Sequence, residues 1–201
     1  KTWSDSNNQD GKRPTSVTVQ LCADGVAVSG KTATIDSTTL TYEWTGLPKY
    51  QTGTTTAIVY TVKEVGEASG KLAGQNGAEY TVTYATPVVD ANGTNETVAN
   101  ITNAYTPGVT SFTATKTWED ANNANSTRPN DLTLTLMKSV NGGTATAIDP
   151  QPTVTVAKSG NVWTYTWSNL PEREGGYDIT YSAVENTVPN GYTKSAETED
   201  S

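Results

Sequence analysis

Apolar and polar residues alternate over short runs along most of this chain. Val and Leu occupy every second position of residues 17–21, and residues 132–136 repeat the pattern with Leu at every second position. Because successive side chains of a β-strand point to opposite faces, this alternation predicts strands with one buried face. Turn sequences such as DG, NG and GG separate the runs, and no segment shows a long apolar period of about 3.6 residues. The pattern therefore predicts an all-β protein.

Four sequence blocks occur twice in the same order. The first is KTWSDSNNQDGKRP at 1–14, which recurs as KTWEDANNANSTRP at 116–129. The other pairs are 17–21 with 132–136, YEWTGLP at 42–48 with YTWSNLP at 165–171, and 58–65 with 179–186. A spacing of about 115 residues is too long for a solenoid repeat, so each copy is expected to be a domain. Pro107 and Gly108 mark the join, and the predicted domains are residues 1–107 and 108–201, each an antiparallel β-sandwich.

Several polar residues fall on strand faces that the alternation predicts to be buried. Lys116 is in phase with the aromatic residues of 112–118, and Asn103 is in phase with the apolar residues of its own run. Glu64 and Glu185 each follow apolar residues at alternate positions. Each of these side chains is therefore expected to point into a core.

Buried charges of this kind need compensation, because an unpaired Lys or Glu in a protein interior costs several kcal/mol. One solution is a buried ion pair. The other is chemistry that removes the charges, since burial lowers the pKa of a lysine and raises that of a glutamate. A neutral amine can attack the amide of a nearby Asn, and a protonated carboxyl can polarise that amide and move protons. Loss of ammonia would then leave an isopeptide bond.

Three motifs in the first copy resemble the B-type repeat of Gram-positive collagen adhesins, the CnaB-like domain, which also occurs in pilins. They are KTWSDSNNQDGKRP, VKEV at 62–65 and ITNAY at 101–105. The resemblance implies a reversed immunoglobulin-like, or prealbumin-like, sandwich with a Lys–Asn isopeptide bond that forms with the help of a Glu. Residue by residue, it implies a cross-link between Lys1 and Asn103, assisted by Glu64.

In the second copy the resemblance assigns the same roles to Lys116 and Glu185. The sequence stops at Ser201, before any equivalent of ITNAY. The second domain is therefore expected to lack its Asn and its last strand, and Lys116 and Glu185 are expected to remain an unreacted pair.

Charge and residue usage argue against several classes of function. The formal net charge of −8 argues against nucleic acid and anionic membranes as partners, and no apolar run approaches the roughly 20 residues of a membrane span. The absence of His removes the commonest general base and metal ligand, and a single Cys excludes an intrachain disulfide. The acidic segment 5–10 lacks the Gly and Glu of an EF-hand calcium loop and is interpreted as a turn. We expect no metal, no cofactor and no enzymatic turnover, the isopeptide reaction being a single self-modification.

These observations favour a structural stalk or pilin-type module of an extracellular, cell-wall-anchored surface protein, with the anchor outside this sequence. Its expected partners are neighbouring repeats of the same parent protein. The alternative is an adhesin module that binds a host matrix protein or a glycan through its loops. Trp163, which has no counterpart in the first copy, is the tryptophan expected to make such a surface contact.

Overall fold

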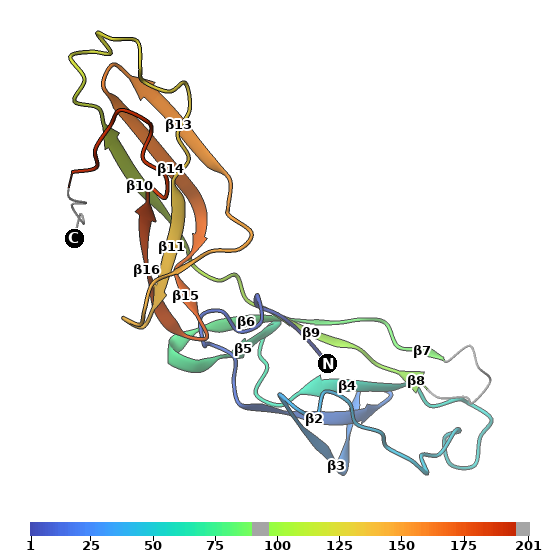
Figure 1. Cartoon of the computed structure of the whole chain (residues 1–201). Coiled ribbons are helices and arrows are strands. Elements are labelled where there is room, and N and C mark those ends of the chain that lie inside the picture. Colours follow the sequence, from blue (N-terminus) through green and yellow to red (C-terminus); the bar gives the residue numbers. More distant parts are fainter. Residues whose placement is uncertain (90–96, 196–201) are drawn as a thin grey trace. The chain divides into compact units, whose positions relative to one another are not determined.

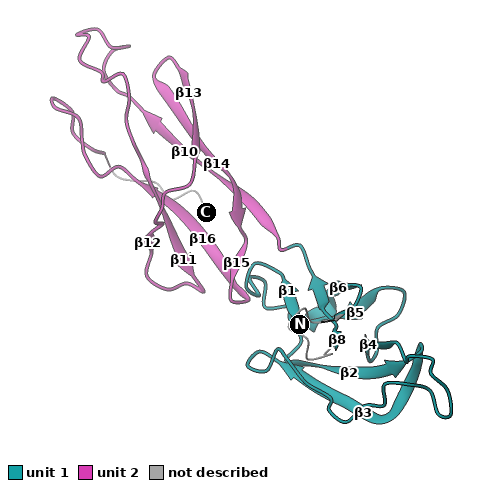
Figure 2. Ribbon diagram, turned by 90° about the vertical axis from the view of Figure 1, so that its right-hand side faces the viewer, with its two compact units in different colours: residues 1–106 teal, residues 107–201 magenta. Residues whose placement is uncertain are grey.

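The computed structural model describes residues 1–89 and 97–195. The chain divides into two compact units, Lys1–Thr106 and Pro107–Ser201 (Figure 2), and this division falls one residue before the predicted join. The one helical element in the described residues is the short 3-10 turn η1 (Gln75–Gly77), so the all-β prediction is confirmed. Within those residues no helix is long and apolar enough to cross a membrane.

Unit 1 contains two main sheets, which form two layers in Figure 1. Their strand orders are β1-β9-β6-β5 and β3-β2-β4, and a small ribbon joins β7 to β8. The strands are β1 Thr2–Ser4, β2 Ser16–Ala23, β3 Val26–Asp36, β4 Tyr60–Glu64, β5 Lys71–Ala73, β6 Glu79–Tyr84, β7 Val88–Val89, β8 Thr97–Val98 and β9 Ile101–Ala104.

One pairing in unit 1 departs from the predicted antiparallel pattern. The strands β1 and β9 run in the same direction, with Thr2 opposite Thr102 and Trp3 opposite Asn103. The pairing joins the first and the last strand of the unit. It therefore brings residues about a hundred positions apart in the sequence to the same place.

The core of unit 1 lies between its sheets. Val17, Val19 and Leu21 of β2 are each at most 6% exposed, as the alternation predicted, and burial of such a side chain contributes about 1.5–3 kcal/mol. The buried cluster comprises Val17, Val19, Ala33, Ile35, Leu72, Val82 and Ile101, with Trp3, Trp44 and Val62 packed against it. Glu64 lies opposite Val19 on the neighbouring strand β4. Since Val19 is buried there, this register takes Glu64 into the core.

Unit 2 also contains two main sheets, with the strand orders β10-β14-β13 and β12-β11-β16-β15. The strands are β10 Val109–Thr117, β11 Thr135–Val140, β12 Thr146–Ala147, β13 Val154–Ser159, β14 Val162–Pro171, β15 Arg173–Glu174 and β16 Tyr177–Val184. The strand predicted at 132–136 begins only at Thr135. Leu132 and Leu134 precede it and still pack against the core, which explains why their alternation resembles that of a strand.

The core of unit 2 is aromatic and includes Trp163, against our expectation. The buried cluster comprises Trp118, Leu136, Trp163, Tyr165, Trp167 and Leu170. Trp163 is only 4% exposed, and its ring packs edge-on against Trp118 at 5.2 Å between centroids. The prediction of a surface contact for Trp163 is therefore wrong: the register of β14 places it on the same face as Tyr165 and Trp167.

Candidate cross-linking site

Glu64 lies between a lysine amine and an asparagine amide in the interior of unit 1. Lys1 Nζ is 3.4 Å from Glu64 Oε1, and Asn103 Nδ2 donates a hydrogen bond of 2.9 Å to Glu64 Oε2. The side chains of Lys1 and Glu64 are 2% and 0% exposed, and Asn103 is 0% exposed. The structure thus brings together the three residues that the sequence singled out in the first copy, with one carboxylate in contact with both of the others.

Three separate segments build this site. Lys1 directly precedes β1, Glu64 is the last residue of β4 and Asn103 lies in the middle of β9. Alternation along β9 buries both Ile101 and Asn103, so the amide points into the core. The parallel pairing of β1 with β9 then places the start of the chain beside that amide.

The amine of Lys1 is held in an environment that favours its neutral form. Burial lowers the pKa of Lys1 to about 8, and the attraction and hydrogen bonding of Glu64 oppose that effect without cancelling it. The positive charge of Arg13 lowers the pKa further, and the negative charge of Asp5 raises it. With that pKa, roughly a tenth of the amine is unprotonated at pH 7. A neutral amine is the form that can act as a nucleophile.

The amide oxygen of Asn103 is buried without a partner. Among the described residues, no group hydrogen-bonds to Asn103 Oδ1, and Glu64 Oε1 likewise has only its ion pair with Lys1. An unsatisfied buried polar atom costs about 1–3 kcal/mol, so such atoms are rare and often mark sites of chemistry. The site therefore brings an amine, a carboxylate and an amide carbonyl without a hydrogen bond together in one buried cluster.

Unit 2 has the equivalent lysine and glutamate in a more open setting. Lys116 Nζ donates a hydrogen bond of 2.9 Å to Glu185 Oε2, and their side chains are 18% and 6% exposed. Glu185 follows the end of β16, as Glu64 ends β4. The two residues thus form a direct ion pair, whereas the carboxylate of unit 1 is shared between an amine and an amide.

A second arrangement, which the sequence analysis had interpreted only as a turn, lies beside each site. Asp5 accepts two hydrogen bonds from Arg13, at 2.9 Å from Nε and 2.6 Å from Nη2, and a third of 3.0 Å from the hydroxyl of Tyr80. Asn8 accepts a bond from the backbone of Arg13 and donates its own backbone N–H to Asp5. The carboxylate oxygens of Asp5 thus face a guanidinium, which supports the turn interpretation. We call Asp5, Asn8, Arg13 and Tyr80 the clamp of unit 1.

Unit 2 has an equivalent clamp. Asp120 accepts bonds from both Nε and Nη2 of Arg128 and from the hydroxyl of Tyr192, and Asn123 takes the place of Asn8. The signal in the sequence was the shared spacing of Asp, Asn and Arg-Pro within the two KTW blocks. The tyrosine could not be found in this way, because it lies far along the chain at a different distance in each copy.

The turn within each clamp is left-handed. Three successive residues before Arg13, from Ser6 to Asn8, have φ between 49° and 60°, and residues 121–123 have φ between 50° and 61°. Asn tolerates this region better than most residues because its short side chain bonds to the nearby backbone. The repeated Asn pairs in the two KTW blocks therefore have a structural reason.

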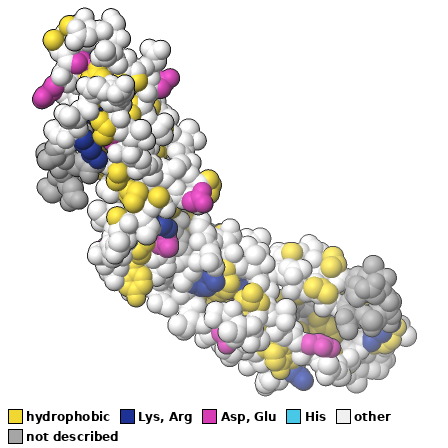
Figure 3. All heavy atoms as spheres, in the orientation of Figure 1, with side chains coloured by type: hydrophobic (Ala, Val, Ile, Leu, Met, Phe, Trp, Pro, Cys, Tyr) yellow, Lys and Arg dark blue, Asp and Glu magenta, His cyan; other side chains and the backbone are white. Residues whose placement is uncertain are grey.

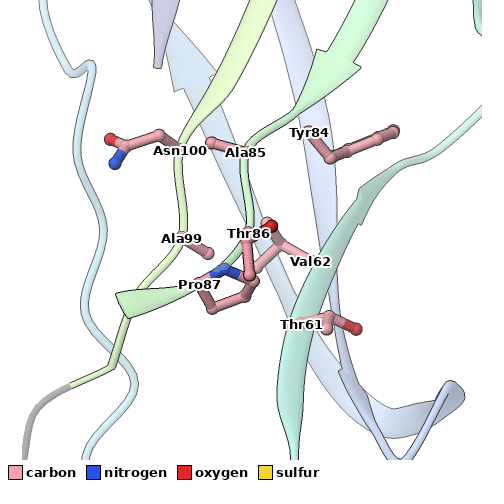
Figure 4. A pocket seen from close by; sticks show the side chains of 8 residues that line it. All are labelled: Thr61, Val62, Tyr84, Ala85, Thr86, Pro87, Ala99 and Asn100. Atoms are coloured by element: carbon pink, nitrogen blue, oxygen red, sulfur yellow. The ribbon is translucent and has the colours of Figure 1, made fainter. Parts of the chain in front are cut away.

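A small surface hollow in unit 1 is the other concave feature near the site. Its volume is about 250 Å³, and Figure 4 shows Val62 of β4 beside Thr86 and Pro87 of the neighbouring segment. The remaining lining residues are Thr61, Tyr84, Ala85, Ala99 and Asn100. It is smaller than the roughly 300–1,000 Å³ of typical ligand pockets and has no charged side chain in its lining. Its lining combines aliphatic side chains with the uncharged polar groups of Thr, Tyr and Asn.

Each unit combines two main sheets with a Lys–Glu pair, so the chain consists of two copies of one kind of domain. Comparison with known proteins identifies the family of that domain. The sequence profile of the Cna protein B-type domain matches residues 1–104 and 112–201, and the chain belongs to this family.

The relatives are staphylococcal. The chain is 37% identical over 203 residues to a collagen adhesin of Staphylococcus aureus, covering 100% of this chain and 14% of that protein. It also resembles the solved structure of two B repeat units of the collagen binding protein of S. aureus, with 32% identity and a TM-score of 0.57 over 92% of this chain and 43% of the other. The chain thus spans a small part of the adhesin and under half of the two-repeat structure.

Proposed function

We propose that this chain is a structural stalk module in which unit 1 closes itself with an isopeptide bond between Lys1 and Asn103. The observation that carries the proposal is the buried contact of Glu64 with both the amine and the amide. Membership of the Cna B-type family supports the structural role.

The chemistry would begin with proton transfer from the Lys1 ammonium to Glu64, which leaves a neutral amine and a protonated carboxyl. The amine then attacks the amide carbon of Asn103. The Asn103 amide oxygen has no hydrogen-bond partner among the described residues. If the side-chain amide rotates so that this oxygen takes the place of Nδ2 beside Glu64, it can accept a hydrogen bond from the protonated carboxyl as negative charge develops on it.

The intermediate collapses as the carbon–nitrogen bond to Nδ2 breaks and Glu64 delivers its proton to the leaving nitrogen. The carboxylate so formed takes up the second proton that Nζ must lose to become an amide N–H, and Glu64 ends the reaction protonated. One ammonia leaves, and Nζ and the carbonyl carbon become a new amide. No oxidant, metal or cofactor is needed. The reaction owes its rate to proximity, because the folded unit holds amine and amide together in a site closed to water.

The bond would connect the first residue of unit 1 to its last strand. Tension that separates β1 from β9 would then act on a covalent bond rather than on the three residue pairs of that short ladder. By analogy with disulfides, closing a loop of about a hundred residues also destabilises the unfolded chain by roughly 4–5 kcal/mol. Both effects suit a module that transmits force.

We place the parent protein outside the cell, anchored to a Gram-positive cell wall, with neighbouring repeats as the partners of this module. The alternative, an adhesin module that grips a host matrix protein or a glycan, has less support. Trp163 is buried, and on the face shown in Figure 3 the apolar side chains lie in separate small groups. A binding surface would favour a contiguous patch.

Intact mass spectrometry of the purified chain tests the proposal. We expect a mass lower than that of the sequence by one ammonia, and a digest that contains a peptide joining Lys1 to Asn103. The variant Glu64→Ala should fold but keep its full mass, while the matched variant Glu185→Ala in unit 2 should lose ammonia like the wild type. A wild-type mass equal to that of the sequence contradicts the proposal.

A further inference from the structure

The tryptophan beside the Lys1 amine is held by a closed ring of contacts. Lys1 Nζ lies 4.0 Å from the centroid of the Trp3 ring, and the Arg13 guanidinium lies 5.3 Å from it. Tyr80 packs edge-on against Trp3 at 5.3 Å, and its hydroxyl donates to Asp5, which grips Arg13. Arg13 is thus fixed by a carboxylate on one side and contacts the ring that the amine touches.

The same contacts occur in unit 2, where Lys116 and Arg128 lie 4.9 Å and 5.6 Å from the centroid of Trp118. Within the described residues, the indole N–H of Trp3 and that of Trp118 are both buried without a hydrogen bond. Their rings are therefore held by packing and cation–π contacts rather than by a hydrogen bond to the indole. Losing the arginine would remove one cation–π contact from each ring, and so one of its restraints.

We propose that Arg13, held by Asp5, is a positioning residue for the Lys1 amine: it keeps the Trp3 ring in the place that aims Nζ at the Glu64–Asn103 pair. This inference rests on the proposed isopeptide reaction. Arg13 does not touch Glu64 or Asn103 in any contact of the structure, so it would act through Trp3 and through its charge.

The charge of Arg13 gives the proposal a signature that packing alone would lack. The charged groups facing the Lys1 amine are Glu64 from β4, Arg13 and Asp5 from the loop, and the chain's own terminal amine. Arg13 lowers the pKa of Lys1 and Asp5 raises it. Removing Arg13 alone leaves Asp5 unopposed, so the pKa of Lys1 rises. Transfer of the ammonium proton to Glu64 is then less favourable, which lowers the rate, and the pH at which the Lys1–Glu64 pair loses its shared proton moves up.

The test measures the rate of ammonia loss against pH. The unreacted chain is recovered from inclusion bodies in denaturant, its full mass is verified, and the reaction is started by dilution into buffers between pH 5 and pH 10. Samples are quenched in acid and weighed. For Arg13→Gln we expect a rate about tenfold lower at pH 7 and a midpoint shifted to higher pH.

Two further variants separate position from charge. Arg13→Lys keeps the positive charge but loses the flat, two-pronged guanidinium, so its midpoint should return toward that of the wild type while its rate stays low. Arg128→Gln removes the same clamp from unit 2 and should leave both rate and midpoint unchanged. This matched control excludes a general effect of damaging a clamp.

Folding is checked separately, since Arg13→Gln leaves Asp5 buried without its partner. The double variant Asp5→Asn with Arg13→Gln removes both charges, and its midpoint should lie near that of the wild type with a reduced rate. If Arg13→Gln or the double variant reacts at the wild-type rate and midpoint, Arg13 has no positioning role. A wild-type chain that never loses ammonia would overturn the cross-link itself, and this inference with it.

Discussion

The segments YEWTGLP and YTWSNLP, alike in sequence, fold differently in the two units. In unit 2 the segment forms most of β14, and Tyr165 and Trp167 are each 1% exposed. In unit 1 the matched residues belong to no strand, Tyr42 is 54% exposed and Trp44 is only partly buried. Equal local sequence therefore does not produce equal structure.

The difference lies in the partner strand. In unit 2, β10 pairs with β14 along most of its length, with Lys116 opposite Trp163. In unit 1 the terminal amine of Lys1 donates to the backbone oxygen of Leu40, the residue that corresponds to Trp163. The register is thus the same, but among the described residues of unit 1 no strand pairs with residues 42–48. Strand formation depends on a paired neighbour more than on local preference.

The opposite end of the fold shows the reverse contrast. In unit 1, β9 and β6 complete the sheet that contains β1 and supply Asn103 and Tyr80. In unit 2, residues 185–195 form no strand, yet Tyr192 still bonds to Asp120. The clamp therefore persists without the strand in which its tyrosine lies in unit 1. The proposed cross-linking site, by contrast, takes its Asn103 from β9.

The largest expected effect is on the stability of unit 1 when Asn103 is replaced. Asn103→Ala cannot form the isopeptide bond, so unit 1 should lose roughly 4–5 kcal/mol of unfolding free energy. Hydrogen exchange read by mass spectrometry on peptides of unit 1 measures the loss, and peptides of unit 2 serve as the internal control. Unchanged exchange in unit 1 would mean that no cross-link supports it.

Limited trypsin digestion under native conditions tests the contrast between units directly. In the wild type we expect the first cuts in unit 2, at sites such as Lys138, Lys158, Arg173 or Lys194, because a cross-linked unit 1 opens less often. Unit 1 carries Lys12, Lys31, Lys49, Lys63 and Lys71, so its survival would not reflect a lack of sites.

The control for this digestion is Asn103→Ala, in which unit 1 should be cut far sooner than in the wild type. Equal digestion of both units in the wild type would argue against the asymmetry.

Much of the fold followed from local pattern. Alternation along β2 predicted the burial of Val17, Val19 and Leu21, and period two along β9 predicted that Asn103 points inward. Duplication of four blocks predicted two tandem copies of one domain, and the family profile matches the chain twice. These features depend on residues near one another in the chain, where the two-residue period of a strand carries the information.

What the sequence could not supply was long-range pairing. The parallel contact of β1 with β9, the burial of Trp163 and the bond from Tyr80 to Asp5 each join residues that are far apart in the chain. Spacing and composition do not encode which strand edges meet. In the sequence the clamp appears only as a repeated motif. Its proposed positioning role could be inferred only from the contact of Arg13 with the Trp3 ring in the structure.

A smaller effect should follow from giving the segment at 40–46 a partner. Fusing the sequence of residues 109–115, VTSFTAT, directly ahead of Lys1 would extend the register that Lys1 begins with Leu40. Tyr42 and Trp44 should then become buried, stabilising unit 1 by about 1–3 kcal/mol and shifting Trp44 fluorescence to shorter wavelength. A seven-residue Gly-Ser extension is the matched control. Equal spectra for the two fusions would show that the segment does not pair.

The smallest expected difference concerns acid and the two clamps. Burial acts on Asp5 most strongly and raises its pKa, but the hydrogen bonds from Arg13 and other donors outweigh burial and leave the pKa below its ordinary value of 3.8. For Asp120 the hydrogen bonds of Arg128 are the largest influence, and the pKa lies far lower. A carboxylate with a depressed pKa contributes stability above its unfolded-state pKa and loses it as the pH falls through the folded-state value.

Because the pKa of Asp120 is the lower of the two, the clamp of unit 1 should weaken at a higher pH than that of unit 2. Asn mimics a protonated Asp, so the difference in unfolding free energy between the wild type and an Asp→Asn variant disappears when that Asp becomes protonated. As the pH falls from 4 toward 2, this stability gap should close first for Asp5→Asn and should persist for Asp120→Asn. Pulse proteolysis with pepsin in graded urea can follow each unit over this range. Comparing each variant with the wild type removes the constant contribution of the proposed cross-link, so the order in which the gaps close depends on the clamps. If the gap for Asp120→Asn closes first, the pKa of Asp5 in the folded protein is not the higher of the two, and burial does not weaken the clamp of unit 1 relative to that of unit 2.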